Sequence, residues 1–351
     1  SVLAGEAVAV TALSSSVAVA IVDGIIFRSS NGGSTWTAGA SASGRNRLLK
    51  VSADVVLAYG RGGTFPDFDD RILRSDDGGQ TWIDLGEVIP ATAYAADLNF
   101  TVLSASIIVA SDGSGNLYRS IDAGLSWSMS HATPGPSQGF FSNGPADFVD
   151  AQTGYIGYGS GYLLRSDDGG ASWTQISSGS GIDIMDMDRF SNGDLIAVGT
   201  SGQVLTRSAG STSWTIRGTL GEATLEAVQV TGPQQVVAVG RTGIVHRSED
   251  GGATWQAASS APASLTATDL HFEDLSNGWV IGQGFGGAAL FHTTDAGAKW
   301  NPVTDFQGTY VAVDFAGASG WAASYNGTVY RTIDAGNSWS EAQIPGGSLS
   351  I

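Results

Sequence analysis

The sequence predicts an all-β fold built from eight copies of one four-stranded antiparallel unit. The first observation is a nine-residue motif that returns along the whole chain, as "RSSNGGSTW" (28–36), "RSDDGGQTW" (74–82), "RSIDAGLSW" (119–127), "RSDDGGASW" (165–173), "RSAGSTSW" (207–214), "RSEDGGATW" (247–255), "HTTDAGAKW" (292–300) and "RTIDAGNSW" (331–339). Its closing tryptophans recur about every 43 residues, so eight units account for the 351 residues. The second observation is that 50 glycines and short apolar runs suit strands joined by tight turns. Four-stranded units with a period of about 40–45 residues indicate a β-propeller with one blade per unit.

The last unit shows the strands expected in one blade. The runs "YVAVDF" (310–315), "GWAASY" (320–325) and "TVYRT" (328–332), with a fourth that begins at Trp339, predict four strands of ordinary length. We expect one domain over residues 1–351, with approximate blade limits of 5–40, 46–87, 93–132, 138–178, 182–219, 224–260, 265–304 and 309–345. The first and last units look complete, and no strand exchange between the termini is visible. A seven-bladed ring with one aberrant unit is the alternative.

The nine-residue motif itself is interpreted as a structural turn. Asp77 is placed to accept backbone N–H bonds, Gly79 supplies the positive φ that the turn needs, and Trp82 can wedge between blades. The same structural roles fall to Asp122, Asp168, Asp250, Asp295 and Asp334, and to Trp36, Trp127, Trp173, Trp214, Trp255, Trp300 and Trp339. The fifth copy is interpreted as one residue short, with Ala209 and Gly210 where the aspartate and its neighbours should stand.

The charge of the chain excludes several classes of partner. Lys and Arg number 16 against 33 Asp and Glu, which gives a net charge of −17. Nucleic acids and anionic membrane surfaces are bound through clustered Lys and Arg, so neither is expected. There is no cysteine, hence no disulfide or thiolate metal site. No apolar run approaches the roughly 18 residues that a transmembrane segment requires.

The pattern S/T-x-D-x-G-x-T/S-W is the Asp-box, or BNR, repeat, and the chain resembles the Asp-box propeller superfamily along its full length. Residues 146–173 and 269–282 are similar to the repeats of the photosystem II assembly and stability factors and their bacterial relatives. Those factors are generally seven-bladed and have an arginine-rich partner surface, whereas seven of the fourteen arginines here belong to the boxes. Sialidases, xyloglucan-cleaving glucanases and the sortilin ectodomain also use the box. The resemblance implies that the boxes lie remote from the functional site.

We therefore expect the functional surface on the face opposite the boxes, where loops gather on a rigid scaffold. Three insertions fall there, at 60–70, 128–145 and 282–288. They carry the candidate binding residues Arg61, Phe65, Asp67, Asp69, Asp70, His131, Phe140, Phe141 and Phe285. Aromatic side chains beside carboxylates suit sugar stacking or a protein hot spot. The alternative is that the phenylalanines pack under their own loops and the acids are solvated.

A second set of acids recurs at one position of the expected innermost strand: Asp97, Asp147, Asp186, Asp269 and Asp314. A residue repeated in most blades is interpreted as serving each blade, by hydrogen-bonding the adjacent connection, rather than as forming one catalytic ring. No cofactor is expected. If calcium binds, the candidate ligands are Asp67, Asp69 and Asp70.

These observations predict a non-catalytic protein that binds a protein partner or a surface glycan through the face opposite the boxes. We expect it to be extracellular, periplasmic or lumenal, or on a virion surface. The sequence "FRSS" (27–30) belongs to a box and is not the F-R-I-P motif of sialidases. The alternative is a glycoside hydrolase, sialidase-like or glucanase-like, whose two carboxylates, about 5–10 Å apart, come from Asp67, Asp69, Asp70 and Asp147.

Overall fold

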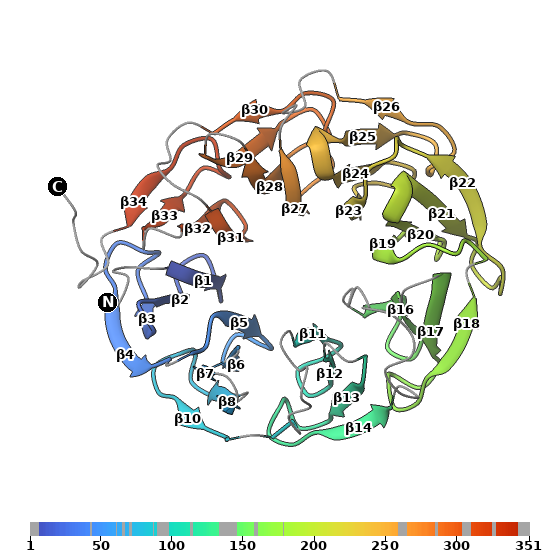
Figure 1. Cartoon of the computed structure of the whole chain (residues 1–351). Coiled ribbons are helices and arrows are strands. Elements are labelled where there is room, and N and C mark those ends of the chain that lie inside the picture. Colours follow the sequence, from blue (N-terminus) through green and yellow to red (C-terminus); the bar gives the residue numbers. More distant parts are fainter. Residues whose placement is uncertain are drawn as a thin grey trace.

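Eight four-stranded antiparallel sheets follow one another around a ring in this computed structural model (Figure 1). The prediction of an all-β, eight-bladed propeller is confirmed, and the seven-bladed alternative is wrong, because each repeat forms a sheet of its own. The structure describes residues 7–42, 44–60, 62–64, 67–69, 72–86, 88–89, 98–112, 115–132, 146–157, 161–177, 179–258, 265–284, 287–303, 310–324 and 328–342.

The blades are built in chain order. Blades one to four contain β1 (Ala7–Ala12), β2 (Ala18–Val22), β3 (Ile25–Ser29) and β4 (Thr37–Ser41); β5 (Arg47–Lys50), β6 (Val56–Tyr59), β9 (Leu73–Ser75) and β10 (Ile83–Asp84); β11 (Asn99–Val102), β12 (Ile108–Ser111), β13 (Leu117–Ser120) and β14 (Ser128–His131); and β15 (Asp147–Phe148), β16 (Gly154–Gly157), β17 (Tyr162–Ser166) and β18 (Thr174–Ser177). Blades five to eight contain β19 (Ile184–Arg189), β20 (Leu195–Gly199), β21 (Gln203–Arg207) and β22 (Thr215–Thr219); β23 (Leu225–Val230), β24 (Val236–Gly240), β25 (Val245–Ser248) and β26 (Gln256–Ala257); β27 (Thr266–Phe272), β28 (Gly278–Gly284), β29 (Gly287–Thr293) and β30 (Asn301–Pro302); and β31 (Tyr310–Ala316), β32 (Ser319–Ser324), β33 (Val329–Thr332) and β34 (Ser340–Ala342). The 3₁₀ turns η2 (Thr200–Gly202) and η3 (Arg241–Gly243) join the second and third strands of blades five and six.

Each blade runs from the centre of the ring to its rim, so the first strand lines the centre and the fourth lies on the circumference (Figure 1). The turns between strands one and two share a side of the ring with the Asp-boxes between strands three and four. We name this side the box face. The connections between strands two and three, and between blades, lie on the opposite side, which we name the loop face.

The core lies between the blades. Every residue of β2, β20 and β24 is buried, whereas every residue of the outer strand β22 is exposed. A second strand is covered on both faces by neighbouring blades, which explains continuous apolar runs such as "AVAIV" (18–22). One buried cluster joins Phe27 and Trp36 of blade one to Trp321 and Ala323 of blade eight. The box tryptophan thus packs at the interface between its own blade and the preceding one. We call each such interface between neighbouring blades a joint.

Within the part of the chain that the structure describes, the ring closes without an exchanged strand, because β1–β4 and β31–β34 are both complete sheets of consecutive strands. Side chains link the last blade to the first instead. The Asp314 carboxylate accepts hydrogen bonds from the Thr11 hydroxyl at 3.1 Å and the Ala12 amide at 2.8 Å. Arg331 donates to the Ser34 hydroxyl at 3.3 Å. Packing and these polar contacts hold the two ends of the ring together.

The Asp-box of blade two shows how the motif holds its turn. Asp77 Oδ1 accepts hydrogen bonds from the Gln80 and Thr81 amides, both at 2.9 Å, and Oδ2 accepts from the Thr81 hydroxyl at 2.6 Å. The Ser75 hydroxyl donates to Asp77 Oδ1 at 2.8 Å and accepts from the Gly79 amide at 2.8 Å. Burial opposes the charged carboxylate, but these bonds outweigh it and lower the pKa of Asp77 to about 2.

The box glycine allows the blades to approach each other. Gly79 has a φ of +86°, and a Cβ atom there would lie 2.6 Å from a methyl group of Val19 in blade one. A side chain at this position would therefore be strained in its backbone and would collide with the neighbouring blade. The turn and the joint consequently require the same glycine.

Blade five corrects the alignment that the sequence suggests for its box. Strand pairing places Arg207 at the register that the box serine Ser248 has in blade six, and Thr206 at the register of the box arginine Arg247. The copy is therefore not one residue short. It is a full-length motif, "TRSAGSTSW" (206–214), in which most of the box residues are replaced.

This shift of one residue turns Arg207 to the other face of its strand. Its guanidinium lies 4.9 Å from the ring centroid of Tyr155 in blade four, and its side chain is buried. In the altered turn, the indole Nε1 of Trp214 is buried and has no hydrogen-bond acceptor. In blade six, Trp255 Nε1 donates to the Gly252 carbonyl at 3.1 Å.

Candidate functional site

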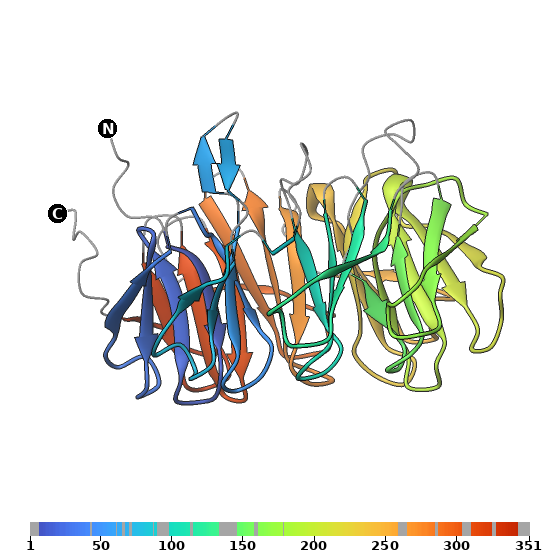
Figure 2. The same ribbon diagram turned by 90° about the horizontal axis from the view of Figure 1, so that it is seen from below.

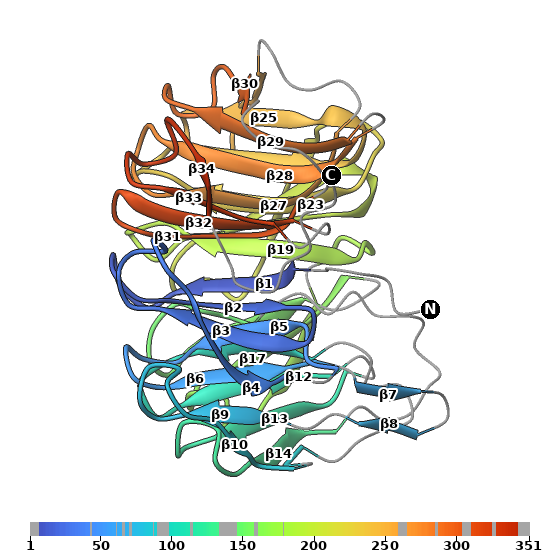
Figure 3. The ribbon, with the colours of Figure 1, turned by 90° about the vertical axis from the view of Figure 1, so that its left-hand side faces the viewer.

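The loop face carries a hairpin that stands above the ring. β7 (Gly62–Thr64) and β8 (Asp67–Asp69) pair with each other and are inserted between β6 and β9 of blade two. Figures 2 and 3 show this hairpin projecting beyond the eight blades. Blade seven also extends, since β28 and β29 remain paired as far as Gly284 opposite Gly287. Both of these predicted insertions are therefore built, at least in part, from paired strands.

Of the residues predicted for this surface, His131 is described in full. It ends β14 and is half-buried, and burial lowers its pKa. Asp67 and Asp69 begin and end β8, and their backbone alone is described. The other predicted residues, Arg61, Phe65, Asp70, Phe140, Phe141 and Phe285, lie outside the described residues. The cluster of these side chains therefore stays a prediction.

The recurring acids at the centre of the ring link one blade to the next. Asp186 on β19 accepts a hydrogen bond from the Val228 amide of β23 at 2.9 Å. Asp314 makes the corresponding link across the closure of the ring. A further acid, Asp188, which sequence reasoning missed, accepts from the Val230 amide at 2.6 Å. These are the contacts expected of a structural role.

Asp147 of the same set is different, because its Oδ2 is buried without a hydrogen-bond partner. Burial, then repulsion from Asp188, raises the pKa of Asp147 to about 6, although Arg189 acts in the opposite direction. Burial also raises the pKa of Asp186 to about 7. A raised pKa is what a general acid needs, but here its main cause is enclosure between blades. The side chains of Asp97 and Asp269 lie outside the described residues.

Asp112, which directly follows β12, is held by hydrogen bonds from nearby residues. The buried Asp112 carboxylate accepts from the Asn116 amide at 2.8 Å, from Asn116 Nδ2 at 2.9 Å and from the Tyr118 hydroxyl at 3.1 Å. Within the described ranges, no three His, Cys, Asp or Glu side chains are grouped to hold a metal ion. The same ranges contain no helix with the length and apolar character to cross a membrane.

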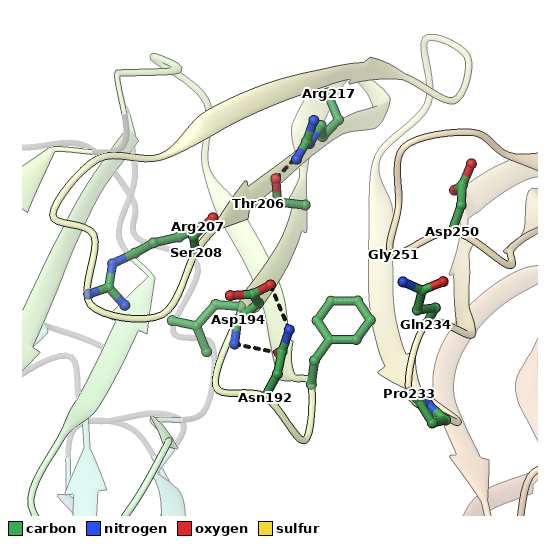
Figure 4. A pocket seen from close by; sticks show the side chains of 12 residues that line it. Asn192, Asp194, Thr206, Arg207, Ser208, Arg217, Pro233, Gln234, Asp250 and Gly251 are labelled. Atoms are coloured by element: carbon green, nitrogen blue, oxygen red, sulfur yellow. Dashed lines mark hydrogen bonds between the residues drawn. The ribbon is translucent and has the colours of Figure 1, made fainter.

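Sequence reasoning also missed a pocket of about 160 Å³ on the box face, between blades five and six (Figure 4). Blade five contributes Phe190, Asn192, Asp194, Leu195, Thr206, Arg207, Ser208 and Arg217, and blade six contributes Pro233, Gln234, Asp250 and Gly251. Figure 4 shows Arg207 directed away from Asp250 and Gly251. The signal that could have located the pocket is the altered box of blade five.

The repeats of this chain are similar in sequence to those of known proteins. A family model described as photosynthesis system II assembly factor YCF48 matches residues 258–350. The chain is a BNR-type β-propeller. Over 159 residues, this propeller is 31% identical to the photosystem II assembly lipoprotein Ycf48 of Synechococcus sp. (strain CC9902). That match covers 43% of the chain and 46% of the relative, so it spans about half the length of the relative.

Solved structures share the fold of this BNR-type propeller. YCF48 bound to D1 peptide is similar with a TM-score of 0.57 and 17% identity, over 82% of this chain and 90% of that one. YCF48 from Cyanidioschyzon merolae gives 0.58 and 16%, over 95% and 97%. The GH74 xyloglucanase from Xanthomonas campestris gives 0.52 and 15%, over 96% and 73%. At such identities the likeness shows the fold alone, and the same fold carries both binding and hydrolysis.

Proposed function

We propose that this BNR-type propeller is a non-catalytic binding protein that recognises a protein partner through its loop face. The observation that carries the proposal is the similarity of its repeats to Ycf48, together with a structure of YCF48 bound to D1 peptide. The projecting β7–β8 hairpin supports the loop face as the binding surface, because its paired strands stand beyond the ring of blades (Figure 2).

The hydrogen bonds at the centre of the ring argue against one catalytic ring formed by the recurring acids. Asp186 and Asp314 are engaged with the amides of neighbouring blades, so their carboxylates are used in structure. The curated relative is a lipoprotein of photosystem II assembly. On that ground we infer a lumenal or periplasmic location for this chain.

The test is a calorimetric titration of the D1 peptide into the full chain. In one variant, residues 62–69 are replaced by Asn-Gly, a two-residue sequence that favours tight hairpin turns. The matched control is Arg241→Ala, which changes the exposed η3 turn of blade six on the same face. We expect saturable binding that is at least about tenfold weaker without the hairpin, equivalent to about 1.4 kcal/mol, and unchanged in the control.

A second assay separates the proposal from the other functions of this fold. The protein is incubated with polysaccharides and sialylated glycans, and bound protein and released reducing ends are read from the same wells. Release of sugar would overturn the non-catalytic assignment. Glycan binding without release, together with no peptide binding, would replace the protein partner with a carbohydrate.

A further inference from the structure

Arginines of the boxes tie three successive joints of the ring together on the box face. In each joint, the box arginine of one blade donates to the carbonyl that follows the box aspartate, or its equivalent, of the next blade. These bonds run from Arg28 Nε to Gly78 O at 2.7 Å, from Arg74 Nη1 to Ala123 O, and from Arg119 Nε to Gly169 O at 2.8 Å. A charged donor on a backbone carbonyl is among the stronger hydrogen bonds in proteins.

The joint between blades five and six lacks this arginine. Thr206 occupies its register, and its hydroxyl is hydrogen-bonded to Arg217 of its own blade. Arg165 and Arg247 keep the register in blades four and six, where they pair with carboxylates of their own boxes. In blade seven His292 stands at this register and stacks on Trp279. Among the described joints, the five–six joint therefore has the smallest side chain at this position.

The pocket between blades five and six lies where the missing arginine would point. The carbonyl equivalent to those of Gly78 and Gly169 belongs to Gly251, which lines the pocket. No side chain of the described residues donates a hydrogen bond to it. Asp250 and Gln234 stand beside Gly251 on the same wall (Figure 4). The acceptors that this wall leaves for the pocket are the Gly251 carbonyl and the Gln234 side chain, because the Asp250 carboxylate already accepts hydrogen bonds from Ser248 and Thr254 of its own box.

The opposite wall completes an environment suited to a guanidinium group. Asp194 accepts from Asn192 Nδ2 at 2.9 Å and from the Ala209 amide at 2.7 Å, which fixes its carboxylate at the pocket. Phe190 and Leu195 also line the pocket and are almost fully buried, so the base of the pocket is apolar.

The charges of the pocket are not balanced by its own arginines. Arg217 stands at the pocket, with its Nε bonded to the Thr206 hydroxyl at 2.7 Å. Arg207 is turned to Tyr155 in blade four. The carboxylates of Asp194 and Asp250, the second hydrogen-bonded within its own box, therefore stand at the pocket with the one guanidinium of Arg217, and this negative charge favours a further cation.

We propose that this pocket binds the side chain of an arginine presented by a partner protein, with its guanidinium on the Gly251 carbonyl in place of the missing box arginine. The site lies on the box face, opposite the surface of the proposed function. Its test uses neither the D1 peptide nor a hairpin variant, so either proposal can fail without the other.

The experiment titrates acetyl-Gly-Gly-Arg-Gly-Gly-amide into the full chain and follows binding by NMR. Two peptides of the same length carry citrulline or aspartate in place of arginine. Thr206→Arg fills the pocket from within, and Gln234→Lys places an ammonium group at its exposed wall. Thr37→Arg, at an exposed outer-strand position in blade one, is the matched control.

We expect saturable binding of the arginine peptide and about tenfold weaker binding of the uncharged citrulline peptide. Thr206→Arg should abolish binding and raise the thermal midpoint by about 2 °C, because it ties blade five to blade six. Gln234→Lys should weaken binding about tenfold, and Thr37→Arg should change neither property.

Three outcomes would overturn the proposal. One is equal binding of the arginine and citrulline peptides, or no saturable binding of either. Another is arginine binding that survives both Thr206→Arg and Gln234→Lys. The third is preferential binding of the aspartate peptide, which would make Arg217 the centre of an anion site. If Thr206→Arg fails to fold, Gln234→Lys decides, because its position is exposed.

Discussion

The joints on the two sides of this ring are held together in different ways. Between blades two and three, the buried Arg74 crosses the box face to the Ala123 carbonyl. Between blades five and six, that link is missing, and Asp186 and Asp188 accept backbone hydrogen bonds from β23 at the centre of the ring. A joint that has lost its box contacts is thus still closed by polar contacts elsewhere on the same pair of blades.

The two kinds of joint differ in their sensitivity to pH. An arginine remains charged at every pH at which the protein folds, so the two–three joint keeps its donor. Burial raises the pKa of both Asp186 and Asp188, so the five–six joint depends on carboxyls whose charged form is disfavoured. The kind of group that makes the polar contact, a guanidinium or a buried carboxyl, therefore decides the pH range that the joint tolerates.

The largest contrast is expected between an intact and an altered box. Trp300 in blade seven is 1% exposed, donates to the Gly297 carbonyl at 3.1 Å and packs edge-on against Phe272. Trp300→Ala should lower the free energy of unfolding by about 3–5 kcal/mol. Trp214→Ala, in blade five, should cost about half as much, because this tryptophan is partly exposed and its Nε1 has no partner. Equal losses in chemical denaturation would contradict the comparison.

A smaller contrast is expected between arginines that cross a joint and arginines that do not. Arg74→Ala removes a buried charge-assisted bond and should lower the free energy of unfolding by about 2–3 kcal/mol. Arg247→Ala removes an ion pair with the exposed Glu249 of its own box, and should cost less than about 1 kcal/mol. Urea unfolding of both variants measures the difference, provided that the free energy of unfolding falls with urea concentration at the same slope in each. A loss for Arg247→Ala as large as that for Arg74→Ala would mean that crossing the joint is irrelevant.

The five–six joint should respond to pH through Asp186. Its folded-state pKa of about 7 lies above the ordinary value of 3.8, so the native state binds more protons than the unfolded state between these values. The contribution of Asp186 to the free energy of unfolding therefore falls as pH rises from about 4 to 7. Asp186→Asn keeps an acceptor for the Val228 amide and should be more stable than the parent by about 1–2 kcal/mol at pH 8.

The same pair of proteins provides the control for this prediction. Near pH 4 the aspartic acid is itself uncharged, so the difference between Asp186→Asn and the parent should disappear. Thermal unfolding of both proteins across this range measures the difference directly. A stability difference that is independent of pH would show that Asp186 does not titrate in the folded ring.

The smallest effect is expected at the hairpin of blade two, which belongs to neither kind of joint. No cofactor is expected for this protein, although Asp67, Asp69 and Asp70 are the candidate ligands if calcium binds. Chelation of metal ions with EDTA should therefore leave the thermal midpoint of the protein within about 1 °C of the untreated value. Re-addition of calcium is the control. A fall of several degrees, restored by calcium, would instead make this hairpin a calcium site.

The sequence predicted the regular parts of the ring better than the irregular ones. The boxes and their spacing gave eight complete blades, and the recurrence of Asp186 and Asp314 indicated links between blades. The sequence motif misaligned the box of blade five. Arg207 and Ser208 match the Arg-Ser pair that opens the other boxes, but each lies one position further along its blade than the residue that it matches. Pairing with β20 decides that place, and a motif search does not include it.

The candidate surfaces show the same division. The length and composition of the insertion at 60–70 located the loop face, but its strand pairs depend on backbone hydrogen bonds that composition does not specify. No intact sequence motif marks the pocket between blades five and six; its signal in the sequence is the altered box of blade five. It results from one short side chain, Thr206, at a position where the other described joints have a larger one.

By itself, the sequence determined the fold class and the turn that ends the third strand wherever the Asp-box is intact, because both depend on residues that are close together in the chain. Only the tertiary structure decided the register of blade five, the direction of Arg207 and the enclosure that raises the pKa of Asp147 and Asp186. Those properties depend on which neighbouring blade a side chain meets, and residues about 40 positions away supply that neighbour.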